Sequence, residues 1–134
     1  MNNESELIAI TPIGEANFQK EVLETSEPVL VEFWSPWSEP CKVFNSVMDE
    51  VAMTCAGAVK IVKVNADENP VLSLLFEVQF IPTLLCFVNG KPCATLVGTL
   101  SKEAILTALR GVLPAGVVAG RFPDPHSTTR NPSF

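Results

Sequence analysis

The sequence has few charged residues, and basic residues are the scarcer kind. Charged residues make up 18% of the 134 residues, below the roughly 25% of an average globular protein. Acidic residues outnumber basic ones by 15 to 9, the net charge is −6, and lysine and arginine form no cluster. Because binding to a phosphate backbone requires a positive surface, we expect no nucleic-acid partner.

Long apolar runs are also absent. No run approaches the ~20 residues that span a bilayer, and the longest, residues 80–88, contains a proline and is typical of a strand. The first residues, MNNESEL, are polar and acidic, unlike the basic start and apolar stretch of a signal peptide. We therefore expect a cytoplasmic protein without membrane association.

Cysteine is present but not in metal-binding spacing. The four cysteines are Cys41, Cys55, Cys86 and Cys93, and no two of them form a C-x-x-C pair. This spacing argues against zinc-finger and ferredoxin sites, and we expect neither a metal nor a cofactor. In a reducing compartment the four side chains are expected to be free thiols.

Apolar periodicity predicts one α/β domain over residues 1–112, with the element order β-α-β-α-β-α-β-β-α. The predicted strands are 7–10, 28–34, 59–65, 83–88 and 93–98, and the predicted helices are 14–24, 41–55, 69–77 and 101–111. The βαβ units favour parallel pairing, and Asn89-Gly90 predicts a hairpin, so the central β-sheet should be mixed and flanked by helices. Residues 113–134, which contain prolines and glycines, are interpreted as a flexible tail.

The segment of residues 33–42, FWSPWSEPCK, carries the chemistry of this chain. It places a buried strand, a tight loop and the start of a helix in succession. The first turn of a helix has unpaired N–H groups and a partial positive charge, and both stabilise a thiolate. Ser38 suits the N-cap position, and Pro40 is tolerated in the first turn because its missing N–H would be unpaired there.

This segment resembles the active-site motif W-C-G-P-C-K of the thioredoxin family, with W-S-E-P-C-K in its place. Other stretches are similar to the family in the same order. VLVEFWSPW resembles its second strand and loop, KVNADENP its third strand and turn, and FIPTLLCFVNGK its cis-proline strand and hairpin, and Gly98 matches its glycine after the last strand. The resemblance covers about residues 7–111 and implies a thioredoxin fold.

Ser38 is the main departure from that family. In the family the first cysteine attacks a disulfide and the second resolves the mixed disulfide, whereas here Ser38 holds the first position and Cys41 the second. A serine hydroxyl does not ionise near neutral pH and forms no disulfide, so we expect impaired dithiol turnover. Cys41, one turn inside the helix, is either a near-inert thiol or forms slow mixed disulfides with an oxidant or a client.

Glu32 is an acid inside the predicted buried strand. The resemblance implies that it replaces the family's buried aspartate, which relays a proton with the second cysteine, and that Lys63 matches a lysine next to that acid. Desolvation is expected to raise the pKa of Glu32. A structural Glu32–Lys63 pair, or a glutamate that reaches the edge of the sheet, is the alternative.

The resemblance also implies a groove for protein clients. Ile81-Pro82 matches the family's cis-proline segment, where an extended client adds a strand to free backbone groups, and Trp37 and Pro40 would line the same groove. The alternative is that Pro82 only shapes the core.

Two alternative functions follow, one of a binding module and one of an enzyme. In the first, the chain is a monomeric module that binds protein clients, or a thiol-bearing partner protein, without dithiol turnover. In the second, it is an active protein-disulfide reductase in which Ser38 is an engineered replacement of a catalytic cysteine.

Cys86 and Cys93 flank the predicted hairpin. With a two-residue turn at Asn89-Gly90, residue 88 faces residue 91, residue 87 faces residue 92, and Cys86 faces Cys93. The pair is interpreted as two free buried thiols, with a strained cross-strand disulfide as the alternative.

Overall fold

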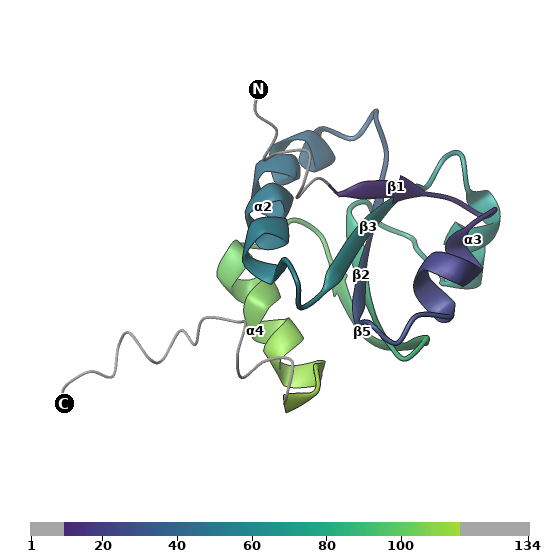
Figure 1. Ribbon diagram of the computed structural model, residues 1–134. Coiled ribbons are helices and arrows are strands. Elements are labelled where there is room, and N and C mark those ends of the chain that lie inside the picture. The colour runs from purple at the N-terminus through teal and green to yellow at the C-terminus, as the bar shows by residue number, and fades with distance from the viewer. Residues whose placement is uncertain (1–9, 116–134) are drawn as a thin grey trace, which may run out of the picture.

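The computed structural model describes residues 10–115 (Figure 1). The strands are β1 (Thr11–Ile13), β2 (Val29–Trp34), β3 (Lys60–Asn65), β4 (Thr83–Val88) and β5 (Lys91–Val97). The helices are η1 (Gln19–Leu23), α2 (Glu39–Cys55), α3 (Pro70–Leu75) and α4 (Lys102–Val112). Among the described residues no helix is long and apolar enough to cross a membrane.

The five strands form one sheet in the order β1-β3-β2-β4-β5. Strands β1 and β2 run parallel to β3, and β4 is antiparallel to both β2 and β5. The predicted α/β class with a mixed central sheet is therefore confirmed. The central strand β2 has neighbours on both sides and is covered on both faces, which explains why its sequence is almost continuously apolar.

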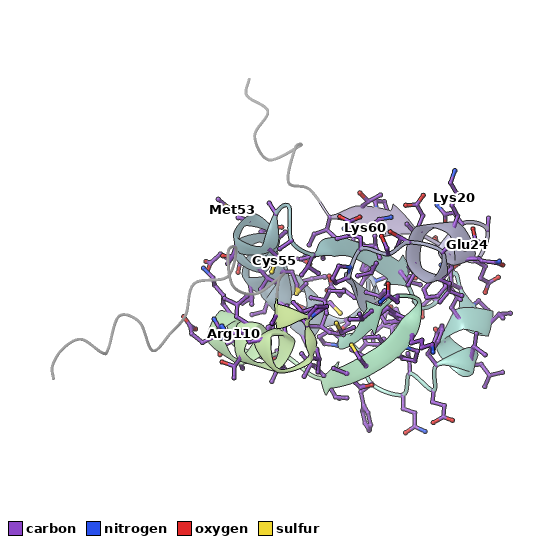
Figure 2. All side chains as sticks on the ribbon, turned by 60° about the horizontal axis from the view of Figure 1, so that its bottom comes forward. Lys20, Glu24, Met53, Cys55, Lys60 and Arg110 are labelled. Carbon is purple, nitrogen blue, oxygen red and sulfur yellow. The ribbon has the colours of Figure 1, made fainter. Side chains whose placement is uncertain are left out.

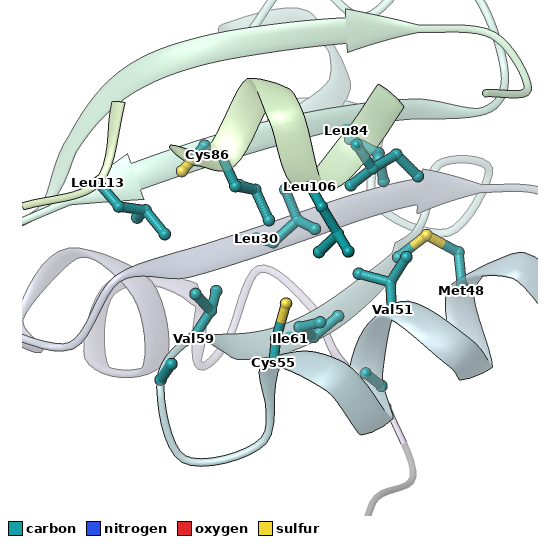
Figure 3. Close-up of a cluster of buried hydrophobic side chains, with 14 of the residues drawn as sticks. Leu30, Met48, Val51, Cys55, Val59, Ile61, Leu84, Cys86, Leu106 and Leu113 are labelled. Atoms are coloured by element: carbon teal, nitrogen blue, oxygen red, sulfur yellow. The ribbon is translucent and has the colours of Figure 1, made fainter. Parts of the chain in front are cut away.

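Two hydrophobic clusters lie on opposite faces of the sheet. Helices α2 and α4 cover one face, and η1 and α3 cover the other (Figure 1). Side chains of β2 alternate between them: Leu30 belongs to the cluster under α2 and α4, and Val31 to the cluster under η1 and α3. Figure 3 shows the first cluster, in which Leu30, Leu84 and Leu106 meet between the sheet and the two helices.

The structure corrects two predicted elements near the N-terminus. The first strand is Thr11–Ile13, because these are the residues that pair with β3. Residues 7–9 of the predicted strand lie outside the described residues. The predicted helix over 14–24 begins as turns, and only Gln19–Leu23 is helical, as a π-helix closed by the Glu24 N–H on the Gln19 carbonyl at 2.9 Å. Val22 of this π-helix is fully buried against the sheet.

The hairpin between β4 and β5 follows the prediction only as far as its second residue pair. Asn89 and Gly90 have φ angles of 52° and 76°, as a tight two-residue turn requires, and Phe87 lies opposite Pro92. A shift of register then places Cys86 opposite Ala94. The predicted pairing of Cys86 with Cys93 was therefore wrong.

The four thiols are free, as predicted, but they differ in exposure. Cys41, Cys55 and Cys86 are buried, whereas Cys93 is exposed, so its predicted burial was wrong. The physical reason is the register shift, which leaves Cys93 as the extra residue of a β-bulge.

The end of α4 bears on the predicted tail. Leu113, the first residue assigned to that tail, is 7% exposed and packs in the cluster under α2 and α4 (Figure 3). Residues 116–134 of the predicted tail lie outside the described residues.

Candidate functional site

The loop between β2 and α2 positions Ser38 as the N-cap of α2. The Ser38 N–H donates to the Ser35 carbonyl at 3.2 Å, which closes the turn after β2. The Ser38 Oγ accepts a hydrogen bond from the Cys41 N–H at 3.3 Å and satisfies one of the unpaired donors of the first helical turn. The serine therefore has a structural use at this junction, and its side chain is only 3% exposed.

Cys41 is the third residue of α2 and the only sulfur of the motif. Its side chain is 2% exposed, so it is as buried as Ser38. Pro40 and Glu39 are exposed beside it, and the Glu39 carboxylate pairs with the Lys42 ammonium at 3.2 Å on the surface. Solvent therefore reaches the prolyl ring of the motif but scarcely reaches its sulfur.

Trp37 and Ser35 are held by one carboxylate that sequence reasoning missed. The Trp37 Nε1–H donates to Asp67 Oδ2 at 2.6 Å, and the Ser35 hydroxyl donates to the same oxygen at 2.7 Å. Asp67 follows β3, so it ties the loop after β3 to the loop after β2. The only signal in the sequence was an acid two residues after a predicted strand. Trp37 remains 67% exposed, with its ring held at the surface rather than packed in the core.

Removal of this carboxylate should loosen the motif loop. We expect Asp67→Ala to lower the free energy of unfolding by about 2 kcal/mol, because two hydrogen bonds to a charged acceptor are lost. Urea denaturation at pH 7 measures the change. Glu68→Ala is the matched control, since the Glu68 carboxylate makes no hydrogen bond or ion pair within residues 10–115. Equal losses in the two variants would contradict the role of Asp67.

The segment before β4 lies at the same end of the sheet as the motif. Thr83 pairs with Phe33, so Pro82 lies level with Trp34, from which the motif loop departs. The Ile81–Pro82 peptide bond is cis, and the Pro82 carbonyl accepts the Gly98 N–H at 2.8 Å. Within the described part of the chain, neither the N–H nor the carbonyl of Ile81 takes part in a hydrogen bond.

Phe80, which sequence reasoning did not single out, is exposed beside this free backbone. Its side chain is 63% exposed, and the Phe80 carbonyl accepts the Thr83 hydroxyl at 2.6 Å, which fixes the backbone there. The clue in the sequence was an aromatic residue directly before Ile81-Pro82. Trp37 and Phe80 are thus two exposed aromatic residues on segments adjoining Pro82.

Glu32 lies in the middle of β2 and is 2% exposed. Leu30 faces α2 and α4, and because side chains of a strand alternate, Glu32 faces that same side, where α2 carries Cys41. Burial raises the pKa of Glu32 to about 7, against the opposing effect of Lys63 and with a smaller raising effect of Asp49. Its Oε2 has no hydrogen-bond partner among residues 10–115. This arrangement can hold a proton near neutral pH.

Lys63 lies opposite Glu32 on β3, as the family resemblance implied, but its ammonium also interacts with Trp34. The Lys63 Nζ lies 5.2 Å from the centre of the Trp34 ring, at cation–π distance. No Glu32–Lys63 contact within ion-pair distance occurs in the described part of the chain. Over residues 10–115 no three His, Cys, Asp or Glu side chains group as metal ligands would.

Comparison with known proteins identifies relatives of this chain. A model of the thioredoxin family matches residues 9–111. The thioredoxin of Haemophilus influenzae is 47% identical over 93 residues, which cover 69% of this chain and 87% of the relative. Thioredoxin 1 of Synechococcus elongatus is 43% identical over 97 residues, 72% of this chain and 91% of the relative. The thioredoxin of Griffithsia pacifica is 38% identical over 103 residues, 77% of this chain and 94% of the relative.

Proposed function

This chain belongs to the thioredoxin family of protein-disulfide oxidoreductases, which act on protein substrates, and we propose that it binds extended protein clients with little or no dithiol turnover. The observation that carries the proposal is the Ser38 hydroxyl at the N-cap of α2, where it accepts the Cys41 N–H. By the family resemblance, this hydroxyl holds the position of the cysteine that attacks a client disulfide.

Turnover is impaired for a chemical reason. Disulfide exchange begins when a thiolate attacks sulfur, and an alcohol does not supply that nucleophile near neutral pH. Cys41 alone could form a mixed disulfide, but its 2% exposure slows the attack, and Ser38 offers no second sulfur to release the client. The cycle therefore lacks both a ready first step and a resolving partner.

Client binding does not depend on the missing sulfur. The free N–H and carbonyl of Ile81 can pair with an extended chain, as in other additions of a strand to exposed backbone. The exposed rings of Trp37 and Phe80 would pack against apolar client side chains, and Pro40 and Pro82 would complete the groove. Because the four cysteines are free thiols, we propose a reducing compartment, the cytoplasm. We also propose that the protein works as a monomer.

A second candidate is a protein-disulfide reductase in which Ser38 replaces a catalytic cysteine. The observation that favours it is Glu32, a buried acid whose pKa burial raises to about 7 on the same side of the sheet as α2. Such a group suits proton transfer to or from a thiol at neutral pH. A cysteine codon at position 38 of the natural gene would favour this candidate over the first.

Binding can be tested with a client that has no disulfide to reduce. Reduced and S-alkylated insulin B chain serves as the probe, titrated into ¹⁵N-labelled protein. We expect the amide signals of Trp37, Phe80 and Ile81 to shift, and Trp37→Ala to weaken binding by about tenfold, as loss of an aromatic anchor does.

The control for this titration is Met53→Ala. Met53 is an apolar residue of α2 with 59% exposure and lies at the end of that helix away from the motif (Figure 2). Its replacement should leave the affinity unchanged. Equal losses with both variants, or no shifts near Ile81, would contradict binding at this groove.

A further inference from the structure

Cys86 and Cys93 form a close pair of thiols outside the Ser38 motif. The Cys93 Sγ–H donates to the Cys86 carbonyl at 3.3 Å, so the Cys93 side chain points at its cross-strand neighbour. Burial raises the pKa of the Cys86 thiol, and the neighbouring Cys93 raises it further. This contact places the Cys93 sulfur against the backbone of Cys86.

The β-bulge of β5 explains why these two side chains meet. The register shift between Cys86 and Phe87 leaves Cys93 unpaired in the ladder, and its thiol reaches the Cys86 carbonyl instead. In the regular register Cys86 and Cys93 would form a directly opposed pair, which strains a disulfide. The bulge replaces that direct opposition, and Cys93 is exposed to solvent.

The two thiols differ in exposure, as expected if one of them attacks the oxidant and the other then completes the disulfide. Cys93 is exposed, whereas Cys86 is 1% exposed and packs in the cluster under α2 and α4 (Figure 3). A dissolved oxidant therefore reaches Cys93 first. Since burial disfavours the Cys86 thiolate, closure onto Cys93 is expected to be the slower step.

The pair is separate from the groove at Pro82. Cys86 lies opposite Leu30 near the start of β2, whereas the motif follows Trp34 at the other end of that strand. Oxidation of this pair therefore requires neither Ser38 nor Cys41.

We infer that Cys93 and Cys86 are a second redox site, which a low-molecular-weight disulfide such as glutathione disulfide converts into a cross-strand disulfide. The Cys93 thiolate attacks one sulfur of the oxidant, forms a mixed disulfide and releases one glutathione. The Cys86 thiolate then attacks the Cys93 sulfur and releases the second glutathione. The two protein thiols lose two electrons and two protons, which the oxidant takes up as two thiols, so the reaction balances without a further reagent.

The experiment uses the folded full-length chain, glutathione disulfide, rapid alkylation of the remaining thiols, and intact-mass and peptide analysis. Wild type should fall from four alkylatable thiols to two and yield a cross-linked peptide pair containing Cys86 and Cys93. Cys93→Ala should show neither the cross-link nor an adduct. Cys86→Ala should stop at one glutathione on Cys93. Circular dichroism checks that each variant is folded, and Cys93→Ala, a change at an exposed position, keeps the test decisive if Cys86→Ala does not fold.

Thr95→Cys in the Cys93→Ala background is the matched control. Residue 95 is also exposed on β5 but lies opposite Leu85, which packs on the other face of the sheet, under η1 and α3. It should give a stable glutathione adduct and no cross-link. Three results would overturn the inference: an adduct on Cys93 of wild type that never closes, a cross-link from Cys86 to Cys55, or equal cross-linking from position 95.

Discussion

Ser38→Cys should raise the rate at which the protein catalyses insulin reduction by dithiothreitol by about 100-fold or more, because the change supplies the missing attacking thiolate. Wild type should accelerate the reaction little over dithiothreitol alone. The new sulfur would take the position of the Ser38 Oγ, at the start of α2, where unpaired N–H groups and the helix dipole stabilise negative charge. Cys41, three residues on, would then resolve the mixed disulfide. Insulin turbidity measures the rate.

Two variants separate the added sulfur from a change in the loop. Ser38→Ala removes the N-cap hydrogen bond without adding sulfur and should stay inactive. Ser38→Cys combined with Cys41→Ala should accumulate mixed disulfides with the client and turn over slowly. A wild-type rate equal to that of Ser38→Cys would contradict the proposed loss of turnover. An inactive but folded Ser38→Cys would mean that Glu39 or Glu32 also departs from the needs of redox catalysis.

Glu32→Gln should stabilise the protein at pH 8 by about 3 kcal/mol and leave its stability at pH 4 nearly unchanged. Burial raises the pKa of Glu32 from 4.5 to about 7 in the folded protein. Between these values the native state keeps a proton that the unfolded chain has lost, so wild-type stability falls as pH rises through this range. Above it the full cost of a buried carboxylate is present. Glutamine has a similar shape and does not ionise, so the variant avoids that cost.

Urea denaturation at several pH values from 4 to 8 measures the effect. The curve of the Glu32→Gln variant should lack the decline between about pH 4.5 and 7 that wild type shows. Glu50→Gln, a change at an exposed position of α2, is the control and should preserve that decline. A constant difference between Glu32→Gln and wild type at all pH values would show that Glu32 does not carry this pH dependence.

The Ser38 motif shows how far local sequence information extends. That Ser38 would suit the N-cap of α2 could be predicted, because capping depends on residues within one turn of the helix. That its side chain would be as buried as that of Cys41 could not, since exposure depends on what packs around the loop. Asp67 was missed for the same reason: its two donors, Ser35 and Trp37, are about thirty residues away along the chain and meet it only when β2 and β3 pair.

Cys86 and Cys93 show that local sequence can also fail to predict pairing between two strands that are adjacent in the chain. The turn at Asn89-Gly90 was predicted correctly because those residues accept positive φ angles. A single extra residue after Pro92 then changed the partner of Cys86 and the exposure of Cys93. Side chains of a strand alternate with period two, so one unforeseen bulge reverses the faces predicted for the residues that follow it, from Ala94 onward.

The sequence by itself determined the order of strands and helices, the mixed sheet, the family and the absence of a sulfur at position 38, because periodicity, turn residues and motifs are local properties. Only the tertiary structure decided which groups are buried, which backbone stays free at Ile81, how Asp67 ties the motif loop, and that Cys93 turns to Cys86. These features depend on the register and packing of segments distant in the chain. The free energy of that packing is shared among many residues, so no single local pattern predicts it.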